Sequence, residues 1–146
     1  MVTIEIERTI PASRDRVWAR YTDHVSWASW AKMGKVRLER EGDGERNGSG
    51  CVRIISNAGV SVAEEVLDFD APRRMTYTVR RGGIPIKDHL GEVTMEERDG
   101  ATLLVWRCHF RSRIPGLGWL WKLLVSRMFA TALTGLERDL AGQPAA

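Results

Sequence analysis

A chain of 146 residues with 43% hydrophobic and 28% charged residues has the composition of an ordinary folded domain, which excludes a disordered or fibrous protein. Its net charge of +3 comes from 22 basic and 19 acidic residues that are mixed along the sequence, so no basic stripe indicates nucleic-acid binding. Cys51 and Cys108 have neither CxxC spacing nor histidines at metal-ligand intervals. We therefore expect free thiols, no metal and no cofactor, in one domain spanning residues 1–146.

The N-terminal third predicts one strand followed by two short helices. Residues 1–11 alternate apolar and polar side chains, which is typical of a half-buried strand and not of a targeting segment, so we expect a cytoplasmic protein. Ser13 is a suitable N-cap for a helix from about Arg14 to Thr22, because its hydroxyl can accept a bond from a free backbone N–H. Trp27 and Trp30 lie one helical turn apart and indicate a second short helix.

The middle of the chain has the pattern of strands separated by turns. The expected strands are residues 36–41, 51–56, 60–69, 75–81, 85–98 and 101–112. Asn57-Ala-Gly59 and Asp99-Gly100 are short turn sequences, and strands joined by such turns must be antiparallel. An antiparallel sheet with its helices gathered on one face is an α+β fold.

The C-terminal segment from about Leu117 to Leu140 predicts one long helix. Its apolar residues recur at three- and four-residue spacing, at Leu117, Leu120, Trp121, Leu124, Met128, Ala132 and Leu136. At 1.5 Å per residue this helix would be roughly 36 Å long, enough to cross a small domain. Trp119, Leu123 and Phe129 widen the apolar surface, so we expect contacts with protein on more than one side or with a partner such as a membrane surface. No pattern predicts an oligomeric state.

The order of these elements and three short strings resemble the SRPBCC superfamily. The strings are Ile10-Pro-Ala-Ser13 with Val17-Trp18, Asp23 and Trp27; Asp70-Ala-Pro-Arg-Arg-Met-Thr-Tyr77; and Gly100-Ala-Thr102 with Trp106. The most similar branch is the polyketide cyclase/dehydrase-like group, which shares the helix-grip fold of START proteins and the birch pollen allergen. The resemblance covers Val2 to about Leu140. It implies a curved seven-stranded antiparallel sheet around the C-terminal helix, with an internal cavity for an apolar or amphipathic small molecule.

Strand alternation indicates which side chains face the helix and line such a cavity. The expected cavity residues are Trp27, Trp30, Met75, Tyr77, His89, Val93, Trp106, Phe110, Leu120, Leu124 and Met128. Arg53 and Glu64 form an inward ion pair if both face the cavity, and an ordinary cross-strand pair if either points outward. Mostly apolar walls with a few polar groups are typical of a small-molecule site.

Three functions are compatible with this pattern. The first is binding of an apolar or amphipathic small molecule such as a lipid, an isoprenoid or an aromatic polyketide. The second is an aromatase/cyclase-like enzyme in which His89, Arg53, Glu64 and Tyr77 are the candidate catalytic residues that steer proton transfers. Asp88 precedes His89, but adjacent strand residues point to opposite faces, so Asp88 is not expected to orient the imidazole. The third is an interaction module that acts through the C-terminal helix.

Overall fold

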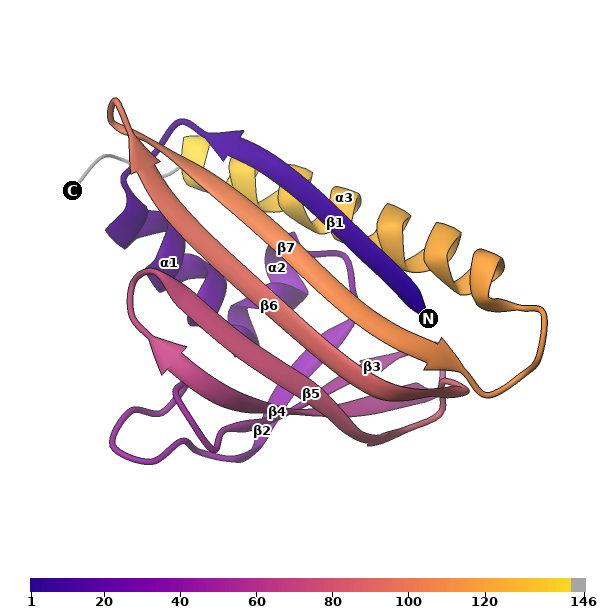
Figure 1. The fold of residues 1–146 in the computed structure, drawn as a ribbon. Helices are drawn as coiled ribbons and strands as arrows, with labels where there is room; N and C mark the ends of the chain where they lie inside the picture. The colour runs from indigo at the N-terminus through magenta and orange to yellow at the C-terminus, as the bar shows by residue number, and fades with distance from the viewer. Residues whose placement is uncertain (143–146) are drawn as a thin grey trace.

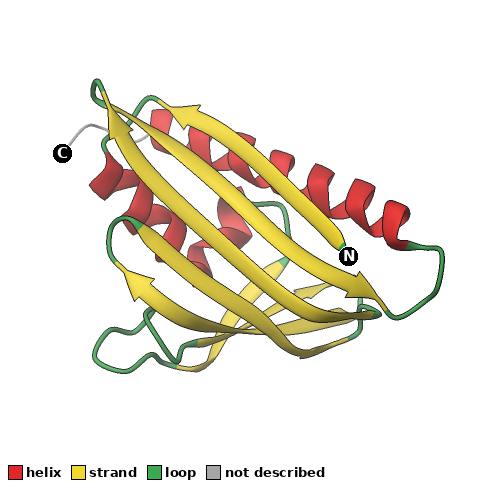
Figure 2. Cartoon of the chain, in the orientation of Figure 1, coloured by secondary structure: helices red, strands yellow, loops and turns green. Residues whose placement is uncertain are grey.

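The computed structural model describes residues 1–142, so residues 143–146 of the expected domain lie outside the described part. The elements are β1 (Val2–Ile10), α1 (Arg14–Thr22), the 3-10 turn η1 (His24–Ser26), α2 (Trp27–Trp30), β2 (Lys35–Arg40), β3 (Val52–Asn57), β4 (Val60–Asp70), β5 (Arg74–Gly82), β6 (Ile86–Arg98), β7 (Ala101–Ser112) and α3 (Gly118–Ala141). The strands form one antiparallel sheet in the order β1-β7-β6-β5-β4-β3-β2, and the helices gather on one face of it (Figures 1 and 2). The expected α+β helix-grip fold is confirmed.

Two tight turns define the register of the β3–β4 and β6–β7 hairpins. Ala58 and Gly59 between β3 and β4 have φ values of 51° and 81°, and Asp99 and Gly100 between β6 and β7 have values of 52° and 80°. Two successive residues with positive φ make the turn whose twist matches that of the flanking strands. Across the first turn Arg53 stands directly opposite Glu64.

The two short helices are held by a cap and by close packing on α3. Ser13 accepts a hydrogen bond from the backbone N–H of Arg16 at 3.4 Å, as its N-cap position predicts. A Cβ added to Gly135 would lie 1.7 Å from the carbonyl oxygen of Trp30, so α2 contacts the backbone of α3 directly. Only glycine permits this approach.

The two halves of α3 have different surroundings. The C-terminal half is anchored by five buried side chains, Phe129, Ala132, Leu133, Leu136 and Leu140. The N-terminal half runs beside the start of β1 (Figure 1) and leaves apolar side chains in solvent, with Trp119 67% and Leu124 47% exposed. Among residues 1–142, no helix combines the length and the apolar character needed to cross a bilayer.

Candidate functional site

A cavity of ≈ 160 Å³ lies between the concave face of the sheet and α3. Its apolar lining comes from Trp27, Met33, Ile55, Val60, Val62, Val79, Ile84, Ile86, Trp106, Phe110, Val125, Met128 and Phe129. Its polar lining comes from Asn57, Glu64, Tyr77, His89 and Cys108. The stack of Trp106 on Phe129, with ring centroids 4.0 Å apart and planes 9° from parallel, lies where the cavity meets the packed core.

Of the eleven cavity residues expected from the sequence, six line this cavity: Trp27, Tyr77, His89, Trp106, Phe110 and Met128. Met75 and Val93 do face the concave side, but they are fully buried in the core. Trp30 is buried beside a different hollow. Leu120 and Leu124 do not line the cavity, because the inward face of α3 passes through Val125, Phe129 and Leu133.

Leu120 and Leu124 were expected in the cavity wall because the sequence does not show which face of α3 meets the sheet. The first three turns of α3 are apolar on nearly all sides, so helical periodicity groups the residues into faces without showing which face meets the sheet. Sequence reasoning also missed Ile84 and Ile86, which follow Gly82-Gly83 at the start of β6. Their alternation was the available signal, since residues 84 and 86 share one side of an extended segment.

Arg53 and Glu64 form an inward ion pair, which decides between the two arrangements left open by the sequence. The Nε and NH2 atoms of Arg53 lie 2.9 and 2.8 Å from Oε1 of Glu64. The side chain of Arg53 is 0% exposed and that of Glu64 is 12% exposed. Burial alone would lower the pKa of Arg53, but the neighbouring Glu64 carboxylate reverses this effect and raises the pKa above its ordinary value. Arg53 is therefore charged at any physiological pH.

Two aromatic rings enclose the guanidinium group of Arg53. Its central carbon lies 4.4 Å from the ring centroid of Trp27 and 4.6 Å from that of Tyr77. Such cation–π contacts are worth about 2 kcal/mol when the cation is desolvated. Glu64 lines the cavity and Arg53 does not, so Glu64 is the member of the ion pair that a ligand in the cavity would contact.

Tyr77 is fixed by a hydrogen bond and by a glycine on the next strand. Trp106 donates through Nε1 to the Tyr77 hydroxyl at 2.6 Å. Gly91 pairs with Tyr77 across β5 and β6, and a Cβ at Gly91 would lie 2.2 Å from the tyrosine ring. Burial raises the pKa of Tyr77 well above its ordinary value, so the hydroxyl stays protonated.

His89 reaches the cavity from a bulge in β6. The register of β6 against β7 shifts between Lys87 and Leu90, and Asp88 adopts a φ of 54°. The carboxylate of Asp88 lies 3.7 Å from Nε of Arg111, so Asp88 pairs with β7 instead of orienting the imidazole of His89. The backbone N–H of Val79 donates to Nδ1 of His89 at 3.3 Å.

The tautomer of His89 follows from these contacts. Burial lowers the pKa of His89, so the ring is neutral at physiological pH. Because Nδ1 accepts a bond from a backbone N–H, the single proton of the neutral ring is on Nε2. His89 therefore presents a hydrogen-bond donor.

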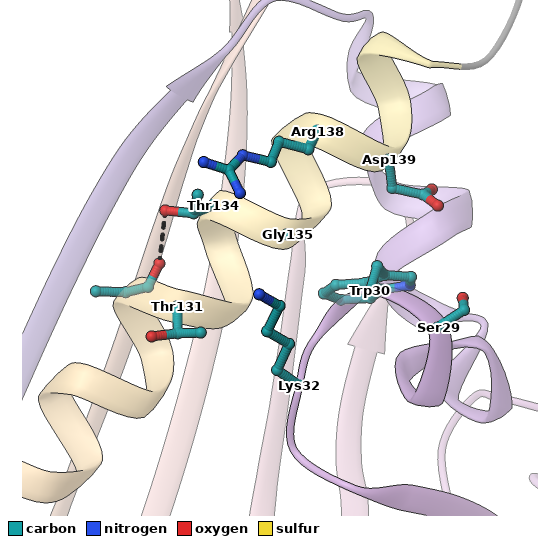
Figure 3. A pocket seen from close by; sticks show the side chains of 9 residues that line it. Ser29, Trp30, Lys32, Thr131, Thr134, Gly135, Arg138 and Asp139 are labelled. Carbon is teal, nitrogen blue, oxygen red and sulfur yellow. Dashed lines mark hydrogen bonds between the residues drawn. The ribbon is translucent and has the colours of Figure 1, made fainter.

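A second, open hollow of ≈ 530 Å³ lies between α2 and α3 (Figure 3). It is lined by Ser29, Trp30, Lys32, Ala130, Thr131, Thr134, Gly135, Arg138 and Asp139. Figure 3 shows Lys32 extending toward α3 beside Trp30. Six of these nine residues carry a hydroxyl or a charged group, so the hollow lacks the mostly apolar residues that line the first cavity. Within residues 1–142, no three histidine, cysteine or acidic side chains form a group that could hold a metal ion.

A curved antiparallel sheet with a long C-terminal helix and an apolar cavity between them defines the helix-grip class of proteins. The chain belongs to the family described as polyketide cyclase / dehydrase and lipid transport, whose model matches residues 1–141. The resemblance to the polyketide cyclase/dehydrase-like group seen in the sequence is thereby confirmed. No curated protein matches the chain in sequence.

Solved structures from several bacteria have the same fold. The protein XoxI from Bacillus cereus is 19% identical with a TM-score of 0.81, and the alignment covers 97% of each chain. A START superfamily protein from Mycobacterium smegmatis is 12% identical with a TM-score of 0.81, covering 97% of this chain and 98% of that one. CalU16 from Micromonospora echinospora is 20% identical with a TM-score of 0.71, covering 98% and 76%. At these identities the likeness concerns the fold alone.

Proposed function

We propose that the protein binds a small apolar or amphipathic molecule in the cavity between the sheet and α3. The observation that carries the proposal is the lining itself, in which thirteen apolar side chains surround a few polar groups. Family membership supports the same class of function, because the family description includes lipid transport.

The volume of the cavity limits what fits without rearrangement. An apolar cavity of about 150 Å³ accommodates benzene, so the ≈ 160 Å³ here suits one ring. A larger ligand would have to displace lining side chains, such as Val125 and Met128 of α3. Met128 is 40% exposed and unbranched, so it can change rotamer at small cost.

Native mass spectrometry of the protein purified from its own host tests the proposal. We expect a co-purified small molecule that dissociates under collisional activation. Toluene serves as a defined probe, because Trp27 and Trp106 line the cavity and their fluorescence should change when it fills. Absence of an adduct, together with unchanged fluorescence at saturating toluene, would refute ligand binding in this cavity.

An enzymatic role is a second candidate, favoured by His89 and Glu64 lining the same cavity. A neutral histidine with its proton on Nε2 can donate that proton during an aromatase/cyclase-like reaction. Of the other two candidate catalytic residues, Arg53 would act by holding Glu64, and Tyr77 by packing against the guanidinium of Arg53. Turnover of a polyketide-like substrate that survives replacement of His89 and Glu64 would remove the basis for this role.

A contact between α3 and a membrane surface is the third candidate. Trp119 and Leu123 are exposed as this role requires, whereas Phe129 is buried against Trp106 and takes no part. Lys122 and Arg127, also exposed, would face anionic headgroups. Sedimentation with anionic vesicles, lost in a Trp119→Ser/Leu123→Ser variant, is the expected result. Equal recovery of both proteins in the supernatant would exclude it.

A further inference from the structure

We infer that the cavity selects a neutral ligand that carries a hydroxyl group over the corresponding carboxylic acid, and that Glu64 accepts a hydrogen bond from the ligand's hydroxyl group. This inference rests on the proposed function and specifies the ligand class of the same site. It concerns the polar groups of the cavity, whereas ligand binding as such requires only its apolar walls.

The carboxylate of Glu64 has one oxygen engaged and one available. Oε1 receives both contacts from Arg53, at 2.9 and 2.8 Å. Among the residues that the structure describes, none donates a hydrogen bond to Oε2. The side chain of Glu64 is 12% exposed and lines the cavity, so Oε2 is open to a molecule that enters it. A ligand hydroxyl would satisfy this oxygen with a charge-assisted hydrogen bond.

Arg53 cannot serve as the anchor for a ligand carboxylate. Its guanidinium lies between the rings of Trp27 and Tyr77, its side chain is 0% exposed, and it contributes nothing to the cavity wall. The group that a ligand meets is the negative end of the ion pair. An ionised acid would therefore place its charge against Glu64 in a desolvated space, and like charges so placed repel each other strongly.

His89 adds a hydrogen-bond donor to the acceptor that Glu64 provides. Its Nδ1 accepts from Val79, so the proton on Nε2 is available to an oxygen of the ligand. The cavity thus combines one negatively charged acceptor and one neutral donor within apolar walls. A phenol or a hydroxylated alicyclic ring matches both, because a hydroxyl oxygen donates and accepts.

Three ligands of one ring each test this inference on the intact wild-type chain. Toluene, phenol and benzoate have similar size, and at about pH 7 only benzoate is ionised. Titrations are followed by tryptophan fluorescence and by calorimetry. We expect phenol to bind at least tenfold more tightly than toluene, since a hydrogen bond to a charged group contributes about 1.5–3 kcal/mol. Benzoate should show no binding in the range where phenol saturates.

A matched pair of double variants assigns the effect to Glu64. Arg53→Met/Glu64→Leu removes the inward ion pair without leaving a buried charge. Arg80→Met/Glu65→Leu removes the ion pair of Arg80 and Glu65, 3.1 Å apart, whose residues do not line the cavity. The readout is the ratio of phenol to toluene affinity, which we expect to fall below about threefold in the first variant and to stay at the wild-type value in the second.

The outcomes separate this inference from the proposed function. If toluene binds and phenol binds no better, or if benzoate binds as tightly as phenol, the selectivity is refuted while ligand binding stands. A phenol preference that persists in Arg53→Met/Glu64→Leu would show that Glu64 is not the acceptor. If none of the three ligands binds the wild-type protein, the proposed function fails, and the inference fails with it.

Discussion

Removing Glu64 alone should destabilise the protein far more than removing Glu64 and Arg53 together. In Glu64→Leu the guanidinium of Arg53 stays enclosed by Trp27 and Tyr77 with no counter-ion. Arginine does not lose its proton in proteins, so the charge remains. Leaving one partner of a buried pair uncompensated costs about 3–5 kcal/mol. A domain of this size has a total stability of about 5–15 kcal/mol, so a large share would be lost.

The double variant Arg53→Met/Glu64→Leu removes both charges and keeps similar side-chain volume. It loses the cation–π contacts, worth about 2 kcal/mol, but it also loses the desolvation cost of two ions. We therefore expect its free energy of unfolding to lie within about 2 kcal/mol of wild type. The difference between single and double variants measures the coupling of the two residues.

Urea denaturation followed by tryptophan fluorescence provides the free energies by linear extrapolation. The control is Arg80→Met/Glu65→Leu, whose parent ion pair is partly exposed, so its removal should change stability by less than about 1 kcal/mol. If Glu64→Leu alone costs less than about 1 kcal/mol, the guanidinium of Arg53 reaches water and the reasoning is wrong. A double variant as unstable as the sum of both single variants would also contradict it.

Three further changes test other parts of the structure. Gly91→Ala should cost about 1–3 kcal/mol in urea denaturation, because its methyl group would collide with the ring of Tyr77. Burial holds the pKa of His24 well below its ordinary value, so below about pH 6.5 the unfolded chain binds a proton that the folded chain does not. The stability of the folded protein therefore falls as the pH falls. His24→Gln should reduce this loss of melting temperature between about pH 7 and pH 5. Leu133→Asp should unfold the protein, whereas Leu124→Asp should leave its melting temperature nearly unchanged.

Local signals made most of the fold predictable from the sequence. The bounds of α1 follow from Ser13, and the turns at Ala58-Gly59 and Asp99-Gly100 follow from residues that tolerate positive φ. Each signal acts within a few residues, so it can be recognised without knowing the rest of the structure. The inward direction of Arg53 and Glu64 could not be predicted in this way. Both directions satisfy the cross-strand pairing, and the aromatic rings of Trp27 in α2 and Tyr77 in β5 favour the inward one.

The hollow part of the molecule begins where α3 loses its packing partners. From Phe129 onward the inward face of the helix is buried, and the stack of Phe129 on Trp106 closes the packed region. Val125, one turn earlier, and Met128, the residue before Phe129, face the cavity, while Leu124 is exposed. The same sheet spans both regions, so the cavity results from the helix lying away from the ends of β3, β4 and β5. A ligand in this space would bury apolar surface of Val125 and Met128, which links ligand binding to the stability of this part of α3.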